Sequence, residues 1–441
     1  MRYAKIAVIL VLAWQDAGAE TLTLRQAAEA VLHQNPELAV SQARVQQAES
    51  GLKQAQGAQM PHVRLSVTAS RTNDALGAFG LKLGQQRITA ADFVPATLNS
   101  PDAINNVNTR VEVQAPLYTG GQMQAQRREA EALVRASRDG DEAARQQLLL
   151  NTLKAWQGVH LARAYLQVAE QGRAAAAEAL RVADSLHKQG AAVKSDALSA
   201  RVNLEDAKLR VSEARRLEAD ALDRLKLLMG RPLGETLEVG AEFLPALPPG
   251  VDEDLRAQAL NQHPALKALR AQVDAAGAGV EAARGARRPQ ISALARQDWN
   301  DKSLGLDAAS YTLAGVLSWN AFDGGVAKAG VDRAQATRLE QAAKLRQAED
   351  GIAYQITEAR RRALEAEERL SARQSAVQQA EEAQRLTQLR YQNGVTTLVD
   401  LLAAQAQLDR TRADLAQARF DRAAARGEVL HAAGLLTLDQ F

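Results

Sequence analysis

Residues 33–38 of the chain read HQNPEL, and residues 261–266 read NQHPAL, with a proline at the fourth position of each stretch. The prolines Pro36 and Pro264 are separated by the same distance as Pro61 and Pro289 (264 − 36 = 289 − 61 = 228). Internal repetition indicates one structural unit used more than once. The sequence therefore predicts an internally duplicated chain, and not two unrelated domains.

The repeat continues with a shorter offset further along the chain. Residues 118–121 read YTGG and residues 322–325 read FDGG, a separation of 204 that also relates Gly230 to Gly434. The first half therefore carries about 24 extra residues (228 − 204 = 24). They fall in residues 74–106, which are rich in Asn, Asp, Gly and Pro and for which we predict a surface hairpin loop.

The N-terminus has the pattern of an export signal. Arg2 and Lys5 precede or flank an apolar stretch over residues 6–14, and residues 17–19 read AGA, a small-residue cleavage site. We predict a signal peptide over residues 1–19 and an exported chain that begins at Glu20. A membrane anchor is the alternative, but the apolar run is shorter than the roughly 20 residues that span a bilayer.

Composition excludes several kinds of chemistry. The chain has no cysteine, which rules out disulfides, thiolate metal sites and thiol catalysis. The formal net charge of +2 gives no polybasic field for nucleic acid. Aromatic residues make up only 4% of the chain, which is typical of long alanine-rich helices.

Long segments of each half have a helical pattern. We predict helices over residues 23–59, 122–188, 196–229, 253–287, 326–392 and 400–433. A helix of 67 residues, as predicted for 122–188 and 326–392, is about 100 Å long. Helices of that length are stable only when they pack lengthwise against others.

An apolar heptad seam for this packing is present in both long segments. It consists of Ile352, Ile356, Ala359, Ala363, Ala366 and Leu370, and, 204 residues earlier, Leu148, Thr152, Ala155, Val159, Ala162 and Leu166. Apolar residues at steps of four and three indicate coiled-coil packing. The long helices are therefore predicted to form a coiled-coil assembly.

Four shorter segments alternate between polar and apolar residues. Residues 63–70, 109–117, 291–299 and 311–322 read as strands with one apolar face. A soluble antiparallel sheet is one interpretation. The other interpretation is that lipid covers the apolar face of the strands. We favour it because the neighbouring helices already use their apolar faces in seams. Four strands are too few to close a transmembrane barrel, which has at least about 8. Because open edges are not tolerated in lipid, several chains would then have to share one barrel.

No pattern of catalytic or ligand-binding residues is found. The six histidines are scattered, without an H-E-x-x-H pair or metal-ligand spacing. The double glycines lack the Lys and Ser/Thr of a phosphate-binding loop. We therefore expect neither an enzyme nor a cofactor or metal site.

Four motifs in this order resemble the TolC family of outer-membrane efflux proteins. They are HQNPEL at 33–38, PLYTGG at 116–121, NAFDGG at 320–325 and YQNGVTTLVD at 391–400. The resemblance implies a mainly α chain with a small β part. As a homotrimer it would form a 12-stranded transmembrane β-barrel, four strands per chain, continuous with a long periplasmic α-helical coiled-coil barrel. Residues 20–230 and 253–441 would be the two repeats, and 231–252 an equatorial linker.

The implied function is an exit duct in the outer membrane of a Gram-negative bacterium. It would serve efflux of drugs or toxic compounds together with a periplasmic adaptor and an inner-membrane transporter of the RND or ABC type. Type I protein secretion and metal efflux are alternatives within the channel class. A soluble periplasmic coiled-coil scaffold is the alternative of another class. Outer-membrane lipid is an expected contact and nucleic acid is not.

The resemblance also implies a gated entrance at the periplasmic helix tips. Asp400 matches the first of two aspartates that narrow this entrance, whereas the second falls on Ala403 and a family arginine falls on Thr396. Asp196 and Tyr391 match a pair that helps to lock the helices shut. The departures from the family pattern at Thr396 and Ala403 put in question how strongly the helices are locked and how selective the entrance is for cations.

These residues also have simpler interpretations. Three copies of Asp400 would form a carboxylate ring that favours cations. Asp196 and Asp400 are alternatively N-caps of the helices that follow them. Tyr391 either hydrogen-bonds to Asp196 or simply packs at a helix end.

Repeated glycines mark the turns. Gly190 and Gly394 are predicted to be left-handed helix C-caps that display the adaptor-docking surface. The pairs Gly120–Gly121 and Gly324–Gly325 are predicted to form the turns from strand to helix.

Overall fold

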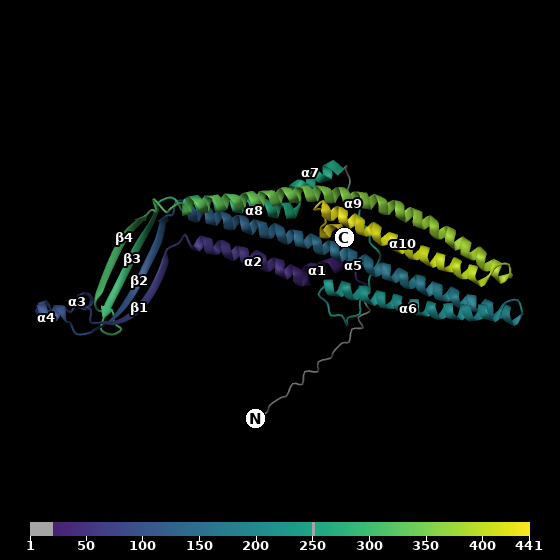
Figure 1. The fold of residues 1–441 in the computed structure, drawn as a ribbon, viewed down its shortest axis with the longest axis horizontal. Coiled ribbons are helices and arrows are strands. Elements are labelled where there is room, and N and C mark those ends of the chain that lie inside the picture. Colours follow the sequence, from purple (N-terminus) through teal and green to yellow (C-terminus); the bar gives the residue numbers. More distant parts are fainter. Residues whose placement is uncertain (1–20, 249–251) are drawn as a thin grey trace, which may run out of the picture. The chain divides into compact units, whose positions relative to one another are not determined.

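The computed structural model describes residues 21–248 and 252–441, so the predicted signal peptide lies outside the described residues. The chain divides into two compact units (Figure 1). Unit 1 holds the chain up to Gln42 together with Asp141–Pro264 and Glu349–Phe441. Unit 2 holds Ala43–Gly140 and Ala265–Ala348. Each unit contains segments from both sequence halves, so the halves interleave.

Unit 2 contains an antiparallel sheet in the order β1-β2-β3-β4 (Figure 1). Its strands are β1 (His62–Thr72), β2 (Ile104–Tyr118), β3 (Gln290–Asp301) and β4 (Ala309–Ser318). The four strands that the alternation predicted are therefore confirmed, with small differences at their ends. The pairing repeats with the sequence, because His62 lies opposite Gln114 and Gln290 lies opposite Ser318 (62 + 228 = 290; 114 + 204 = 318).

The two faces of the sheet differ in chemistry. On one face, Asp298 accepts hydrogen bonds from Arg110 Nε (2.7 Å) and Asn108 Nδ2 (3.1 Å) and pairs with Arg296 Nε (2.9 Å). The other face presents apolar side chains that are largely exposed, for example Leu65 at 68% and Leu313 at 73%. Exposed apolar side chains that follow one another along a strand form a surface that water solvates poorly.

The segment between β1 and β2 is more ordered than the predicted hairpin loop. It contains α3 (Ala75–Gly84), the 3₁₀ helix η1 (Ala90–Phe93) and α4 (Pro95–Asn99). Asp74 caps α3 by accepting a hydrogen bond from Gly77 N (2.7 Å). The Gln85 amide donates to Asn105 O (2.8 Å) and Asn106 Oδ1 (2.9 Å) and so ties the segment to β2. The loop prediction missed these elements because each is shorter than a reliable periodic signal.

The prolines of the two repeated motifs interrupt two of the predicted helical segments. The segment 23–59, in which Pro36 was expected to interrupt the helix, forms α1 (Leu24–Gln34) and α2 (Pro36–Gly57). Residues predicted over 253–287 form α7 (Asp252–Gln262) and α8 (Pro264–Gly285). The residue before a proline disfavours the helical conformation, and Asn35 is extended (ψ 127°).

The two longest helices have the bounds predicted for them, α5 (Gln122–Lys188) and α9 (Val326–Gln392). Each is followed by a shorter helix in unit 1: α6 (Lys194–Leu228) follows α5, and α10 (Leu398–Ala432) follows α9. The predicted seams face inward, since Ile352, Ile356, Ala363 and Leu370 are buried on α9 and Leu148, Thr152 and Val159 on α5. Within the described residues, no helix is both long enough and apolar enough to cross a membrane.

The linker between the halves is fastened to unit 1 through its backbone carbonyls. Trp156, which is fully buried, donates its indole N–H to Ala241 O (3.2 Å). Arg163 Nη1 donates to Val239 O (2.9 Å), and Leu22 N donates to Glu238 O (2.9 Å). These contacts hold residues 238–241 against α5 and against Leu22, although the linker has little regular structure of its own.

The pKa of His431 leads us to expect that the stability of unit 1 depends on pH. Burial, followed by the charges of His263 and Lys154, lowers the pKa of His431 to about 4, while the charge of Glu428 opposes this shift. An unfolded histidine titrates near ~6.5. Between these values the unfolded chain binds more protons, so we expect the free energy of unfolding to fall as the pH drops from about 6.5 to about 4.

The measurement is chemical denaturation across this pH range with wild type and His431→Gln. The expected loss in wild type is on the order of 3 kcal/mol, from 1.36 kcal/mol for each pKa unit. His431→Gln should lose much less, whereas His62→Gln, a change at an exposed histidine, should behave as wild type. Equal acid sensitivity in all three proteins would contradict the assignment to His431.

Candidate functional site

Two helical hairpins in unit 1 end in tight turns, one between α5 and α6 and the other between α9 and α10. Gly190 and Gly394 have positive φ angles of 73° and 70°. Ala191 N donates to Leu186 O (2.9 Å), and Val395 N donates to Arg390 O (2.8 Å). These bonds satisfy carbonyl groups at the helix ends. The prediction of left-handed C-caps at both glycines is confirmed.

The helices that follow the two turns begin differently. Thr397 is the N-cap of α10, and its side chain accepts from Asp400 N (3.2 Å) while Asp400 Oδ2 accepts from Thr397 N (3.1 Å). This reciprocal arrangement is a capping box. The N-cap of α6 is Val193, which has no side-chain acceptor. The prediction that Asp196 and Asp400 are N-caps is therefore wrong, because both helices begin before the aspartate, at Lys194 and Leu398.

Asp400 lies exposed at the tip and is held by several donors. Its Oδ2 atom accepts from Thr397 Oγ1 (2.7 Å) and from Thr396 Oγ1 (2.7 Å). Hydrogen bonds from Thr397 and then Thr396 hold the pKa of Asp400 below its usual range, aided by the charge of Arg390. The carboxylate is therefore charged and oriented at neutral pH. Ala403, one turn further along α10, is exposed as well.

Tyr391 packs in the interior between the hairpins. Its side chain is only 3% exposed and contacts an apolar cluster that includes Val182, Ala200 and Leu401. Its hydroxyl has no hydrogen-bond partner among the described residues. Burial, and secondarily the negative charge of Asp196, raise the pKa of Tyr391. The structure thus shows packing of Tyr391, and not a hydrogen bond to Asp196.

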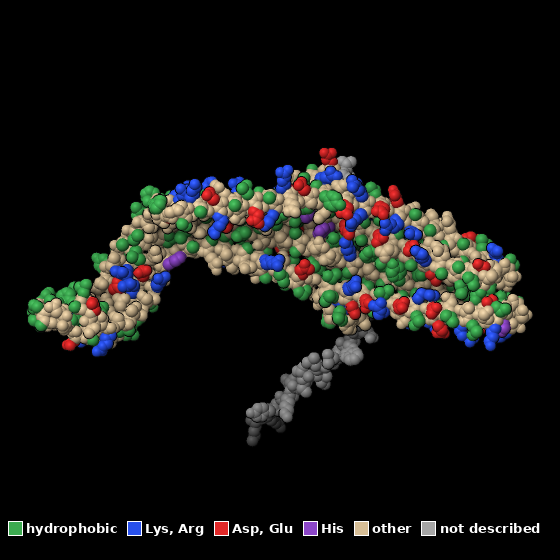
Figure 2. Space-filling view, viewed as in Figure 1, with side chains coloured by type: hydrophobic (Ala, Val, Ile, Leu, Met, Phe, Trp, Pro, Cys, Tyr) green, Lys and Arg blue, Asp and Glu red, His purple; other side chains and the backbone are tan. Residues whose placement is uncertain are grey.

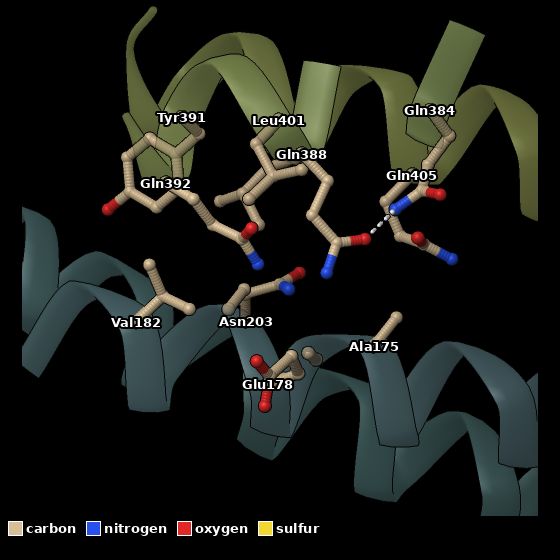
Figure 3. A pocket seen from close by; sticks show the side chains of 13 residues that line it. Ala175, Glu178, Val182, Asn203, Gln384, Gln388, Tyr391, Gln392, Leu401 and Gln405 are labelled. Atoms are coloured by element: carbon tan, nitrogen blue, oxygen red, sulfur yellow. Dashed lines mark hydrogen bonds between the residues drawn. The ribbon is translucent and has the colours of Figure 1, made fainter. Parts of the chain in front are cut away.

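A small amide-lined cavity lies beside Tyr391 (Figure 3). Its volume is about 20 Å³, enough for a single water molecule. α9 and α10 contribute Gln388 and Gln405, while α5 and α6 contribute Glu178 and Asn203. The sequence analysis missed this layer, although glutamines at 384, 388 and 392 repeat every four residues on α9.

Ion pairs join the two helices within each hairpin. Arg412 pairs with Glu381 (2.8 Å) and Arg373 with Asp414 (3.1 Å) across α9 and α10. Arg215 approaches Glu170 (3.5 Å) across α6 and α5. At the tips, the two hairpins meet through the Tyr391 cluster and the amide layer. Further from the tips, α5 and α10 also connect the two hairpins through the Lys154–Glu428 ion pair (2.6 Å), the Tyr165 hydroxyl donating to Gln417 Oε1 (3.0 Å), and a buried cluster of leucines.

The double glycines lie at the turns from strand to helix, as predicted. Gly120 and Gly324 have φ angles of 65° and 66°. A Cβ at Gly120 would overlap the carbonyl oxygen of Gly285, so no other residue fits there without a shift. Asp323 caps the start of α9 by accepting from Gly325 N (2.9 Å) and Ala327 N (2.7 Å).

In the described ranges, no group of three or more His, Asp or Glu side chains lies close enough together to hold a metal ion. At the tips, the helices pack against one another, and the charged side chain of Asp400 is exposed beside this contact.

The sequence matches the outer membrane efflux protein family over residues 27–231 and 255–435. These two matches cover most of both halves, and the chain belongs to this family. It is 28% identical over 239 residues to the toluene efflux pump outer membrane protein TtgC of Pseudomonas putida, covering 50% of this chain and 46% of that protein. The matched stretch is thus about half the length of that relative. The outer membrane efflux protein BepC of Brucella suis is 26% identical over 343 residues, covering 75% and 73%.

Solved structures share the fold. A structure of CusC superposes with a TM-score of 0.81 at 18% identity, covering 96% of this chain and 95% of that one. The Campylobacter jejuni CmeC outer membrane channel gives 0.81 at 18% identity, covering 98% and 93%. The mainly helical architecture with one small sheet is therefore that of known outer membrane channels.

Because α10 has a side-chain N-cap and α6 does not, substitutions at the two N-cap positions should change the free energy of unfolding in opposite directions. Thr397→Val removes the capping box of α10 and should lower the free energy of unfolding by about 0.5–2 kcal/mol. Val193→Thr offers α6 the acceptor it lacks, with Asp196 at the third helical position, and should raise the same quantity by a similar or smaller amount. Thermal or chemical denaturation of both variants is the measurement. Val399→Thr, at an exposed position within α10, is the control for a generic threonine effect. A stabilised Thr397→Val protein would contradict the capping assignment.

Proposed function

We propose that the protein is the outer-membrane exit duct of an efflux pump for small toxic compounds and that it works as a homotrimer. The observation that carries the proposal is the sheet of unit 2, which exposes an apolar face and is open at both edges. Hydrocarbon covers such a face without a solvation penalty. Figure 2 shows hydrophobic side chains gathered over α3 and α4, the helices that follow β1.

The two open edges are the reason for proposing that several copies share one barrel. Every backbone polar group in the hydrocarbon region needs a hydrogen-bond partner, so a membrane sheet has to close on itself. Four strands are too few, since transmembrane barrels begin at about 8 strands. Two copies would supply 8 strands and three copies 12, and the resemblance to the TolC family favours three, with the apolar face outward and the Asp298 face lining the lumen.

The long helices α5 and α9 form the periplasmic part of the proposed duct. A helix of 67 residues is about 100 Å long. Three copies of both hairpins then form a tunnel whose entrance lies at the tips. The contact between the hairpin tips consists of the Tyr391 cluster and the amide layer, and we place the gate at that end.

The turns at Gly190 and Gly394 present the surface on which a periplasmic adaptor docks. Energy comes from an inner-membrane transporter of the RND or ABC type, and the duct itself carries out no enzymatic reaction. Efflux of small molecules is favoured because one relative is described as a toluene efflux pump protein and another, ArpC of Pseudomonas putida, as an antibiotic efflux pump protein.

Cell fractionation combined with an efflux assay tests this function. We expect the chain in the outer membrane as a trimer, seen as three-fold particles with a long tube by electron microscopy in detergent. Deletion of its gene should raise accumulation of a lipophilic fluorescent dye, and a plasmid copy should restore export. Monomers or dimers in the soluble periplasmic fraction, together with unchanged dye accumulation, would favour the scaffold instead.

Asp400 tests the entrance separately from the fold. Three exposed carboxylates around a constriction should favour cations, because the ring attracts charge of the opposite sign. Asp400→Asn should therefore reduce the cation preference measured as a reversal potential in planar bilayers under a salt gradient. Thr397→Val keeps the carboxylate while it removes the capping box, so its selectivity should match wild type. Loss of selectivity in Thr397→Val, with none in Asp400→Asn, would assign Asp400 to helix capping alone.

A further inference from the structure

A wide groove with a mostly apolar lining lies between α5 and α6 in unit 1, and Phe420 of α10 also lines it. Its volume is about 680 Å³, which is in the range of sites that hold drug-sized ligands. The side formed by α5 consists of small residues such as Gly158 and Ala162, and α6 contributes Leu217 and Leu227. These two leucines are 42% and 70% exposed, so the groove is uncovered in the single chain.

The internal duplication provides a matched groove between α9 and α10, with a volume of about 390 Å³. Gly158 corresponds to Arg362 and Leu217 to Asp421 (158 + 204 = 362; 217 + 204 = 421). Charged side chains bridge this second groove, since Arg369 pairs with Asp421 (3.2 Å). Positions that carry charges in the second half are therefore small or apolar in the first half. That difference leaves the α5/α6 groove open to an apolar molecule.

Most polar side chains on the lining of the α5/α6 groove already have partners within the chain. The contacts are Lys154 with Glu428 (2.6 Å), Asp220 with Arg216 (2.6 Å), Tyr165 with Gln417 (3.0 Å) and Asn151 with Gln147 (3.0 Å). A charged ligand would find few free partners here, and burying an unpaired charge is costly. The lining therefore favours an uncharged ligand.

The next copy in the proposed trimer does not fill the groove. Within one chain, α5 lies beside α10, and among the described residues it contributes only Lys154 to the lining of the α9/α10 groove. By the same duplication, α9 of the next copy stands beside α6 and contributes Glu358 (154 + 204 = 358). Its carboxylate faces Arg224, the counterpart of Glu428 (428 − 204 = 224), and balances that charge on the lining.

The groove and the linker between the halves lie on opposite faces of α5. Trp156 and Arg163 donate hydrogen bonds to carbonyl groups of the linker. Gly158 and Tyr165, which line the groove, each follow one of these residues by two positions, about 200° around the helix. In the proposed duct the linker has to lie outside the helical wall, because inside it would obstruct the passage. The groove therefore faces the duct.

We propose that the α5/α6 groove binds an uncharged lipophilic molecule and so holds efflux cargo at the wall of the duct. The inference rests on the proposed function and names a binding site within that duct. The body of the ligand occupies the space between Gly158 and Leu217, and Phe420 offers an aromatic ring for stacking. Removal of apolar surface from water on both sides drives the binding.

Fluorescence of N-phenyl-1-naphthylamine, an uncharged lipophile, measures binding to the trimer in lipid nanodiscs after subtraction of the signal from empty nanodiscs. Gly158→Leu fills the groove, and it is sterically allowed because a Cβ added there meets no atom within 4 Å. Gly140→Leu is the matched control. It makes the same change on α5 at a glycine that also has open space but lies outside the groove.

We expect saturable binding to wild type and to Gly140→Leu. Binding to Gly158→Leu should be at least about tenfold weaker, because the leucine takes the place of several buried ligand carbons. 8-Anilinonaphthalene-1-sulfonate has the same rings with an added negative charge, and it should bind wild type more weakly. Tighter binding of the sulfonate would overturn the assignment to uncharged ligands, and equal binding of the uncharged probe to both leucine variants would overturn the site.

Single-channel recording in planar bilayers tests where the groove lies. The uncharged probe should cause transient partial blockades of wild type and Gly140→Leu, and far fewer of Gly158→Leu, because a ligand on the wall narrows the duct. Saturable binding without any blockade would overturn the place of the site in the duct. Loss of the trimer in Gly158→Leu, but not in Gly140→Leu, would show that the groove is a contact between copies and would also overturn the proposal.

Failure of the site can be distinguished from failure of the proposed function. Trimers in the outer membrane that support dye export but bind no probe would overturn the site and leave the duct intact. A protein that is absent from the outer membrane, with dye accumulation unchanged by its deletion, would reject the proposed function and the site together.

Discussion

Hydrogen bonding at the edges of the four-stranded sheet is the constraint on which the rest of the structure depends. A sheet with an exposed apolar face is stable in lipid only if every strand edge finds a partner. Within the described residues, one chain supplies β1 and β4 as edges and no further strand to cover them. The proposed assembly of several copies would meet this requirement. In that assembly, the long helices that continue from β2 and β4 would be brought together around a common axis.

The two halves of the chain have kept their backbone geometry while their side chains have diverged. Gly120, Gly190 and Gly230 share positive φ angles with their counterparts 204 residues later. At the tips, however, Thr397 caps α10 whereas Val193 leaves α6 without a side-chain cap. Duplicated turns therefore preserve the architecture, and unequal caps make the two hairpins of one chain chemically distinct at the proposed entrance.

The candidate site was only partly accessible to sequence reasoning. The glycine turns were predicted correctly because a positive φ leaves few alternatives to glycine. The N-cap of α10 was predicted at Asp400 but lies three residues earlier, at Thr397. Threonine and aspartate are both common N-caps, and only the backbone hydrogen bonds show that Asp400 is the third residue of the helix. The amide layer beside Tyr391 was not anticipated, because glutamines on α9 acquire a common function only when α5 and α6 lie opposite them.

The sequence alone determined the duplication, the bounds of the two 67-residue helices and the four strands, because periodicity and repeated turns are local properties of a chain. From the number of strands, the sequence also predicted that one chain cannot close a barrel by itself. Tertiary structure decided which strand lies opposite which and at what register, and that the Tyr391 hydroxyl is buried without a hydrogen-bond partner among the described residues. The β1–β2 and β2–β3 pairings and the burial of Tyr391 depend on contacts between residues about 30 to 220 positions apart, whose geometry no local pattern specifies.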